Sequence, residues 1–291
     1  MSLLNINGAT LEFRETGRGE PLLFVHGSAS DWRTWQRQME HFGRQYRVMA
    51  YSRRYHWPNT PIPEGADYAM EAHVDDLRAL IAALGIGPLH LVGHSYGAFV
   101  ALLAAMRQPD TVRSLVLAEP PAITLFVSDP PVPRELVRLL LTRPRVASSI
   151  LRFALGGVRP ATAAARQGNL HAAMDAMGRA VLRRDYFNRL SPSRREQVYD
   201  NAIAAELLGS GFPTVNCDEV SRLQIPTLLL CGEYSPRLFH HIADRLESLL
   251  PRVERAAIPA ASHLVHEDDP VAYNAKVEAF LKRWTGIPPA K

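Results

Sequence analysis

Residues 89–100 decide the fold of this chain: they read Leu-His-Leu-Val-Gly-His-Ser-Tyr-Gly-Ala-Phe-Val. The apolar run Leu89–Val92 has the length of a buried strand, and the alanine-rich run Ala98–Met106 that follows favours a helix. Ser95 stands between them, with a glycine two positions away on either side. Such glycines permit a tight turn without Cβ collisions, and the turn holds the serine hydroxyl above the sheet beside a helix N-terminus. The stretch therefore predicts an α/β fold and makes Ser95 a candidate nucleophile.

The rest of the chain alternates between short apolar runs and helical patterns. Strands are expected at Leu22–Val25, Arg47–Tyr51, Leu89–Val92, Ser114–Ala118, Thr227–Leu230 and Val253–Ile258. Helices are expected at Asp31–His41, Tyr68–Leu84, Tyr96–Arg107, Pro236–Leu250 and Pro270–Trp284. Unbroken apolar runs suit strands that are buried on both faces, so the pattern predicts a mostly parallel central sheet with helices on both faces. The runs Leu3–Asn5 and Thr10–Arg14, joined around Asn7-Gly8, predict an antiparallel hairpin at one edge of the sheet.

One long segment interrupts this alternation. Residues 121–224 contain no strand-like apolar run, only helical stretches rich in Ala, Leu and Arg. We therefore expect a core formed by residues 1–120 and 225–291, with residues 121–224 inserted as a helical cap, or lid. Open α/β sheets bind ligands outside the carboxyl ends of their strands, so the lid is expected to cover that edge.

With these features the chain resembles the α/β-hydrolase superfamily, over nearly all of its length. The first strand after the hairpin ends in His26-Gly27, as the oxyanion loop of that family does. The resemblance implies that the backbone N–H groups of Ser28 and Tyr96 receive the developing oxyanion. Such donors stabilise the negative charge only as it forms.

The resemblance also implies a histidine base after the last strand, where His263 stands in Ala-Ser-His-Leu. A neutral imidazole can accept the proton of Ser95 and return it to the leaving group. Many relatives place the triad acid last in a G-E-x-D pattern, but here that position is Ser235. Two other carboxylates remain. We favour Glu119, which ends the strand next to the nucleophile strand, over Glu233, which the chain is expected to direct aside.

The lid and the loop at residues 51–63 are expected to set specificity. Four aromatic side chains are candidates for substrate contact: Trp32, Tyr55, Trp57 and Phe126. Relatives often carry an Asp-x-Arg-Gly-x-Gly loop where this chain has the bulkier and more basic Tyr-Ser-Arg-Arg-Tyr-His. The four aromatic rings favour an aromatic substrate. Residues 121–225 hold 14 arginines and 9 acidic residues, which indicates either a solvated helical face or a preference for an anionic substrate.

The expected reaction is the cleavage of a carboxylic ester, thioester or lactone through an acyl-enzyme on Ser95, with His263 as general base. Hydrolysis of a carbon–carbon bond on the same triad is the alternative reaction. A catalytically dead binding or signalling protein on this fold is the alternative of another class, supported only by Ser235. Epoxide hydrolases of this fold attack with a carboxylate, and Ser95 argues against that chemistry.

Composition narrows the remaining function classes. The net charge is only +4, and no Lys/Arg cluster interleaved with aromatics predicts nucleic-acid binding. No signal-peptide pattern or apolar run of spanning length is found, so we expect a cytoplasmic protein without a membrane partner, as monomer or homodimer. Cys217 and Cys231 lack metal-type spacing, and no H-E-x-x-H motif occurs. We expect a small-molecule substrate, no metal and no cofactor.

Overall fold

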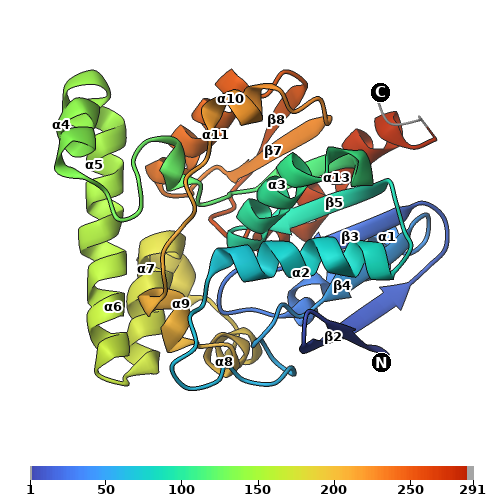
Figure 1. Ribbon diagram of the computed structural model, residues 1–291, viewed down its shortest axis with the longest axis horizontal. Coiled ribbons are helices and arrows are strands. Elements are labelled where there is room, and N and C mark those ends of the chain that lie inside the picture. The colour runs from blue at the N-terminus through green and yellow to red at the C-terminus, as the bar shows by residue number, and fades with distance from the viewer. Residues whose placement is uncertain (1, 287–291) are drawn as a thin grey trace.

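The computed structural model describes residues 2–286, and the side chains of all of these except 183–185. At its centre lies one sheet of eight strands in the order β1-β2-β4-β3-β5-β6-β7-β8 (Figure 1). The strands are β1 (Ser2–Ile6), β2 (Ala9–Thr16), β3 (Pro21–Val25), β4 (Arg47–Tyr51), β5 (Leu89–His94), β6 (Val112–Ala118), β7 (Thr227–Gly232) and β8 (Val253–Ile258). The strand β2 is antiparallel to both β1 and β4, and the other neighbours are parallel. The predicted mostly parallel sheet with an edge hairpin is thereby confirmed.

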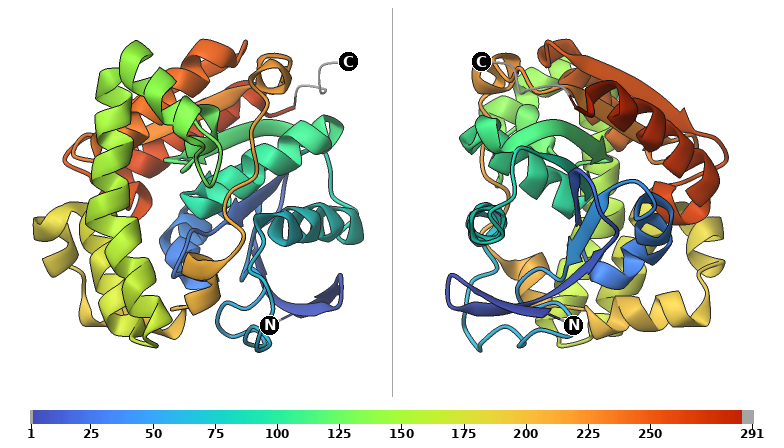
Figure 2. Two further views of the ribbon diagram at one scale, coloured as in Figure 1. Left: turned by 60° about the vertical axis from the view of Figure 1, so that its left-hand side comes forward. Right: turned by 90° about the vertical axis from the view of Figure 1, so that its right-hand side faces the viewer.

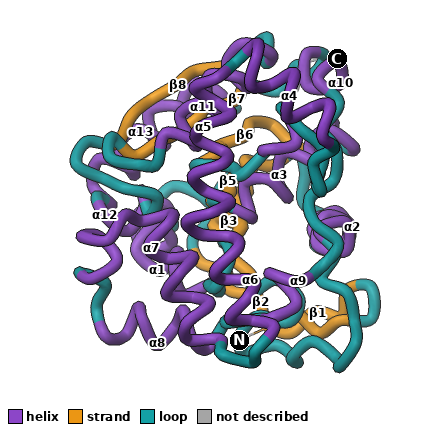
Figure 3. The backbone as a smooth tube through the Cα atoms, turned by 90° about the vertical axis from the view of Figure 1, so that its left-hand side faces the viewer, coloured by secondary structure: helices purple, strands orange, loops and turns teal. Residues whose placement is uncertain are grey.

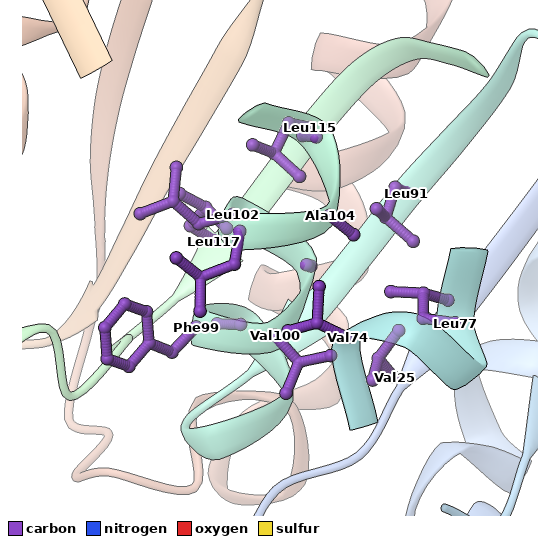
Figure 4. Packing of buried hydrophobic residues seen from close by; sticks show 14 of the residues in the cluster. Val25, Val74, Leu77, Leu91, Phe99, Val100, Leu102, Ala104, Leu115 and Leu117 are labelled. Carbon is purple, nitrogen blue, oxygen red and sulfur yellow. The ribbon is translucent and has the colours of Figure 1, made fainter. Parts of the chain in front are cut away.

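Helices cover both faces of this sheet, as predicted (Figure 2). The helices α2 (Met70–Ala83), α3 (Tyr96–Arg107) and α11 (Arg237–Leu249) pack on one face. The helices α1 (Gln36–Phe42) and α13 (Pro270–Trp284) pack on the other, and the short α12 (Val265–Asp268) precedes α13. Figure 4 shows side chains of α2 and α3 meeting the leucines of β5 and β6. Because residues 22–25 are fully buried, β3 gains stability from both layers.

The structure divides one predicted helix into two pieces. In place of a continuous helix over Asp31–His41, a 3-10 turn at Trp32–Trp35 precedes α1. The carboxylate of Asp31 accepts a hydrogen bond from the Arg33 N–H at 2.9 Å. This side-chain cap satisfies an N–H that has no partner within the turn and fixes where the turn begins.

Between β6 and β7, the described backbone holds helices and no strand. They are α4 (Pro133–Thr142), α5 (Pro144–Phe153), α6 (Arg159–Arg166), α7 (Leu170–Asn188), α8 (Pro192–Asp200), α9 (Ala204–Leu208) and α10 (Cys217–Ser221). A π-helical turn at Ala154–Val158 joins α5 to α6, and Figure 3 shows the two crossing in front of β3 and β5. We call α4 and α5 the lid hairpin. No helix in the part of the chain that the structure describes is long and apolar enough to cross a membrane.

The lid is tied to the loops that follow the parallel strands. Arg194 of α8 forms an ion pair with Glu267, and the Tyr186 hydroxyl of α7 donates to the Ala260 carbonyl at 2.6 Å. Both partners lie beyond the carboxyl end of β8. The helices between β6 and β7 therefore contact segments beyond the carboxyl end of β8, at the edge of the sheet where open α/β folds carry their sites.

Candidate active site

Ser95 occupies a strained turn between β5 and α3. Its φ of 51° and ψ of −123° lie in a region that costs a non-glycine residue on the order of 1–3 kcal/mol. The neighbouring glycines make the turn possible. A Cβ atom on Gly93 would stand 2.5 Å from the Ala98 Cα, and one on Gly97 would stand 2.3 Å from the His26 carbonyl oxygen. Any other residue at these two positions would open the turn that presents Ser95.

Three side chains from distant parts of the sequence form one hydrogen-bonded chain. The Ser95 Oγ lies 2.9 Å from the His263 Nε2, and the His263 Nδ1 lies 2.5 Å from the Glu119 Oε2. The second carboxylate oxygen of Glu119 accepts the Gly232 N–H at 2.8 Å. With Nδ1 donating to the carboxylate, the Nε2 of His263 is left to accept from the Ser95 hydroxyl.

The backbone at the end of β6 directs Glu119 toward the histidine. Its φ is +53°, in the left-handed region, and its N–H donates to the Leu230 carbonyl of β7 at 3.1 Å. Glu233, the other candidate acid, is exposed, and its carboxylate accepts the Ala260 N–H at 2.9 Å. The structure thus brings Glu119 to His263 and places Glu233 elsewhere.

The loop that carries His263 is held from two sides. The Asp268 carboxylate accepts the Ser262 N–H at 2.7 Å and the Ser262 hydroxyl at 3.0 Å. The buried His94 donates from Nε2 to the His263 carbonyl at 2.8 Å. Burial lowers the pKa of His94 to about 3, so this ring stays neutral and keeps its support of the loop.

Burial shifts the pKa values of the acid and the base in opposite directions. Desolvation lowers the pKa of His263 and raises the pKa of Glu119, because a charge is costly in either buried group. The Gly232 N–H, which donates to this carboxylate, and the nearby Ser235 side chain oppose the rise in the pKa of Glu119. Ser235 occupies the position where relatives carry the acid itself, and its buried hydroxyl finds no hydrogen-bond partner among the described residues.

Two donors fix the peptide that joins Gly27 to Ser28. The Gly27 carbonyl accepts the His26 Nδ1–H at 2.8 Å and a guanidinium N–H of Arg53 at 3.0 Å. In a trans peptide the N–H points opposite to the carbonyl, so these bonds set the direction of the Ser28 N–H. A Cβ atom on Gly27 would meet the Ser95 Cβ at 3.1 Å, which places this loop against the nucleophile.

Tyr96 is the first residue of α3. The first N–H groups of a helix have no intrahelical acceptor, and the helix dipole favours negative charge beside them. The Tyr96 side chain is buried, and the Arg53 guanidinium lies over its ring at 4.4 Å. Arg53 thus contacts both predicted donor segments, the Gly27–Ser28 peptide and the start of α3 at Tyr96.

Arg53 is the centre of a buried polar cluster that the sequence reasoning did not identify. It also donates to the Tyr68 hydroxyl at 2.8 Å and to the His26 carbonyl at 3.1 Å. The Glu206 carboxylate, on α9 of the lid, lies 3.7 Å from the guanidinium and interacts with the Ser28 hydroxyl. Burial raises the pKa of Glu206, and the charge of Arg53 opposes that rise. Arg53 stands at the arginine position of the Asp-x-Arg-Gly-x-Gly pattern, and that match could have marked it as a functional residue. No local pattern marks Glu206.

The four aromatic candidates for substrate contact lie in different surroundings. Tyr55 and Trp57 line a cavity of about 510 Å³ between their loop and the lid. Trp32 lies under the Arg14 guanidinium at 4.5 Å, against the core cluster that includes Trp35. Phe126 is half-buried under the lid hairpin. Among the described residues, no hydrogen bond or ring contact joins these four side chains to Ser95 or His263.

Two other rings approach the base. The Phe239 ring of α11 lies 4.3 Å from the His263 ring, and the Phe153 ring of α5 lies 6.4 Å from that of Phe239. No local sequence pattern marks either ring, because their position beside the base depends on how α5 packs on α11. Together they make the wall beside the base aromatic.

Comparison with known proteins identifies the class to which this fold and site belong. Residues 20–270 match the model of the α/β hydrolase fold family, and the chain belongs to that family. The predicted resemblance is thus confirmed, and the protein is a hydrolase of the α/β fold.

Individual relatives carry different activities. The chain is 26% identical to Epoxide hydrolase 3 of Xenopus tropicalis over 274 residues, which is 91% of this chain and 72% of that protein. It is 31% identical to 2-hydroxy-6-oxo-2,4-heptadienoate hydrolase of Pseudomonas putida over 125 residues, 42% of this chain and 45% of that protein. The alignment spans less than half of several such relatives. A thermophilic esterase from Thermogutta terrifontis shares the fold, with a TM-score of 0.72, 24% identity and 98% of each chain covered.

Proposed function

We propose that this hydrolase cleaves carboxylic esters, thioesters or lactones through an acyl-enzyme on Ser95. The proposal rests on one observation, the hydrogen-bonded chain from Ser95 through His263 to Glu119 at the end of a strained turn. A serine hydroxyl is a weak nucleophile unless a base takes its proton, and the Nε2 of His263 is within reach to do so.

In the proposed mechanism the Ser95 Oγ attacks the carbonyl carbon while His263 takes the hydroxyl proton. The Glu119 carboxylate stabilises the imidazolium that forms and holds its tautomer. The N–H groups of Ser28 and Tyr96 receive the oxyanion. His263 then protonates the leaving group, and a water molecule activated by the same imidazole releases the acid and regenerates Ser95.

An apolar, aromatic acyl group suits the surroundings of the base. The rings of Phe239 and Phe153 stand beside His263 and offer apolar contact area. The arginines at positions 134 to 159 are exposed on the lid, so they lend no support to an anionic substrate. Near Ser28, Arg53 and Glu206 face each other. Arg194, which donates to the Ala29 carbonyl at 3.4 Å, is paired with Glu267.

Hydrolysis of a carbon–carbon bond is the second candidate reaction. It is favoured by the 31% identity to the Pseudomonas putida heptadienoate hydrolase over residues that amount to 42% of this chain. The same serine, histidine and carboxylate would serve that reaction. The serine at the turn argues against the carboxylate attack expected of an epoxide hydrolase.

Two measurements test this proposal. Intact-mass spectrometry after fluorophosphonate treatment should show one adduct, mapped to Ser95. A panel of p-nitrophenyl esters assayed beside dienoic diketones should show faster turnover of the esters. Faster diketone cleavage would make carbon–carbon hydrolysis the function. A folded protein that is neither labelled nor active would make it a binding protein on the hydrolase fold.

A further inference from the structure

The outer side of the lid hairpin is the largest concentration of exposed apolar side chains in the described part of the molecule. Of twelve large hydrophobic side chains that are exposed there, seven lie within residues 132–155. Five of them are more than half exposed, and we call these five the lid face: Val137, Leu140, Leu141, Leu151 and Leu155. Leu141 is 81% exposed. Single exposed leucines are ordinary on protein surfaces, whereas several exposed on one pair of packed helices are typical of an interaction site.

The helical repeat shows that this exposure follows from how α4 is oriented. Val137, Leu140 and Leu141 are spaced at i, i+3 and i+4, which puts them on one side of the helix. A surface helix of a globular protein normally turns such a stripe toward the core. Here α4 buries only Leu139, and the side chains of the apolar stripe are more than half exposed. Figure 1 shows α4 at one end of the molecule, away from the sheet.

Arginine side chains surround the lid face. Arg134, Arg138, Arg145 and Arg152 are all exposed on the same two helices. None of these four forms an ion pair with an acidic side chain in the described part of the chain. The one acidic residue between positions 130 and 160 is Glu135, whose carboxylate accepts the Ser128 N–H at 2.8 Å and its hydroxyl at 2.6 Å.

We propose that the lid face docks the protein on the surface of an anionic phospholipid bilayer. An amphipathic helix with leucines on one side and arginines along its border lies in the plane of a bilayer interface, with its apolar side in the acyl boundary. Guanidinium groups bind phosphate through paired N–H donors, and an anionic leaflet attracts each of them. The expectation of no membrane partner rested on the lack of a spanning segment, which surface docking does not need.

The charge distribution favours a bilayer over a second copy of this chain. A twofold contact through the lid face would bring the arginines of one copy against those of the other. The single acid of this stretch is engaged with Ser128, so no free carboxylate of α4 or α5 would offset that repulsion. A bilayer supplies negative charge and apolar volume together.

Docking would engage the helix whose inner side borders the candidate active site. On α5, Leu151 faces solvent, while Phe153 contacts the Phe239 ring that lies against His263. An apolar ester dissolved in the bilayer would therefore meet the lid close to the proposed nucleophile. The docking itself does not depend on the proposed reaction.

The experiment is co-sedimentation of the full chain with vesicles of phosphatidylcholine, with and without phosphatidylglycerol, at low and high salt. We expect binding to the anionic vesicles that weakens as salt is raised. Leu140→Ser/Leu141→Ser and Arg138→Gln/Arg145→Gln should each reduce that binding on the order of 10-fold or more. The matched control is Leu3→Ser/Val271→Ser, which changes two side chains that are 66% and 78% exposed outside the lid and should bind like the wild type.

Two further results would overturn the proposal. One is the absence of binding to anionic vesicles at low salt, or equal loss in the lid variant and the control. The other is a dimer by light scattering that Leu140→Ser/Leu141→Ser converts to monomer without any vesicle binding, which would make the lid face a contact between copies. Fluorophosphonate labelling should be unchanged in the lid variant, which shows that it is folded.

Discussion

The carboxyl edge of the sheet and the lid hairpin differ in how they bury apolar side chains. In β3 every residue from 22 to 25 is fully buried, and the neighbouring strands hold Ser95 and Glu119 in left-handed backbone conformations. In α4 the apolar stripe faces solvent, and Leu141 is 81% exposed. Strained backbone conformations persist only where the packing and hydrogen bonds around them hold them in place. We propose from this contrast that the chemistry resides in the core, whereas the lid determines which substrates reach it.

The largest effect is expected from Ser95→Ala, which removes the proposed nucleophile from the core. Removal of the attacking oxygen should lower kcat on the order of 10³-fold or more, as in other triad knockouts. The fluorophosphonate adduct should disappear, and circular dichroism should be unchanged because a small side chain is removed. If the wild type is labelled but Ser95→Ala keeps its activity, the nucleophile is not Ser95.

The acid of the proposed triad gives the next largest effect. Glu119→Gln should lower kcat about 10²- to 10⁴-fold, because the imidazolium loses its counter-charge. Burial already lowers the pKa of His263, and loss of the neighbouring negative charge should lower it further, so the acid limb of the rate profile should move to lower pH.

Glu233→Gln is the matched control for Glu119→Gln. Its carboxylate is exposed and bonds only the Ala260 N–H among the partners described, so kcat should stay near the wild-type value. If Glu233→Gln shows the large loss and Glu119→Gln does not, the assignment of the acid is wrong.

Arg53→Lys tests whether the core sets the oxyanion loop, with a smaller effect. Lysine keeps the positive charge but is a single point donor, so it cannot bond the Gly27, His26 and Tyr68 oxygens together. Loss of direction at the Ser28 N–H should lower kcat about 10- to 100-fold with little change in KM. A change in thermal stability with kcat intact would limit Arg53 to a structural role.

How much of this molecule is predictable from its sequence depends on whether the signal is local. The strands and the turn at Ser95 follow from apolar runs, glycines and spacing within about ten residues. Glu119 was favoured over Glu233 because it ends the strand beside the nucleophile strand, and it is the acid that lies 2.5 Å from His263.

Other features depend on packing between segments far apart in the chain. The approach of Glu206 to Arg53 joins residues 153 positions apart, and no periodic pattern reports such a contact. The amphipathic pattern of α4 is visible in the sequence, but it does not tell which side faces the core. In most surface helices the apolar stripe faces the core, whereas α4 buries Leu139 and leaves Val137, Leu140 and Leu141 exposed.

The smallest predicted effect compares two neighbouring lid residues, Phe153 and Leu151, on opposite sides of α5. Phe153→Ala removes a half-buried ring that packs on Phe239, whereas Leu151→Ala trims a side chain that is 56% exposed. Because apolar pocket contacts discriminate weakly, the kcat/KM ratio of p-nitrophenyl benzoate to p-nitrophenyl acetate should change about 10-fold or less in Phe153→Ala. Leu151→Ala should leave the ratio unchanged, and both variants should label at Ser95 like the wild type. Equal ratios in the two variants would show that the inner side of the lid hairpin does not contact the acyl group. In that case α5 would not contribute to substrate selectivity.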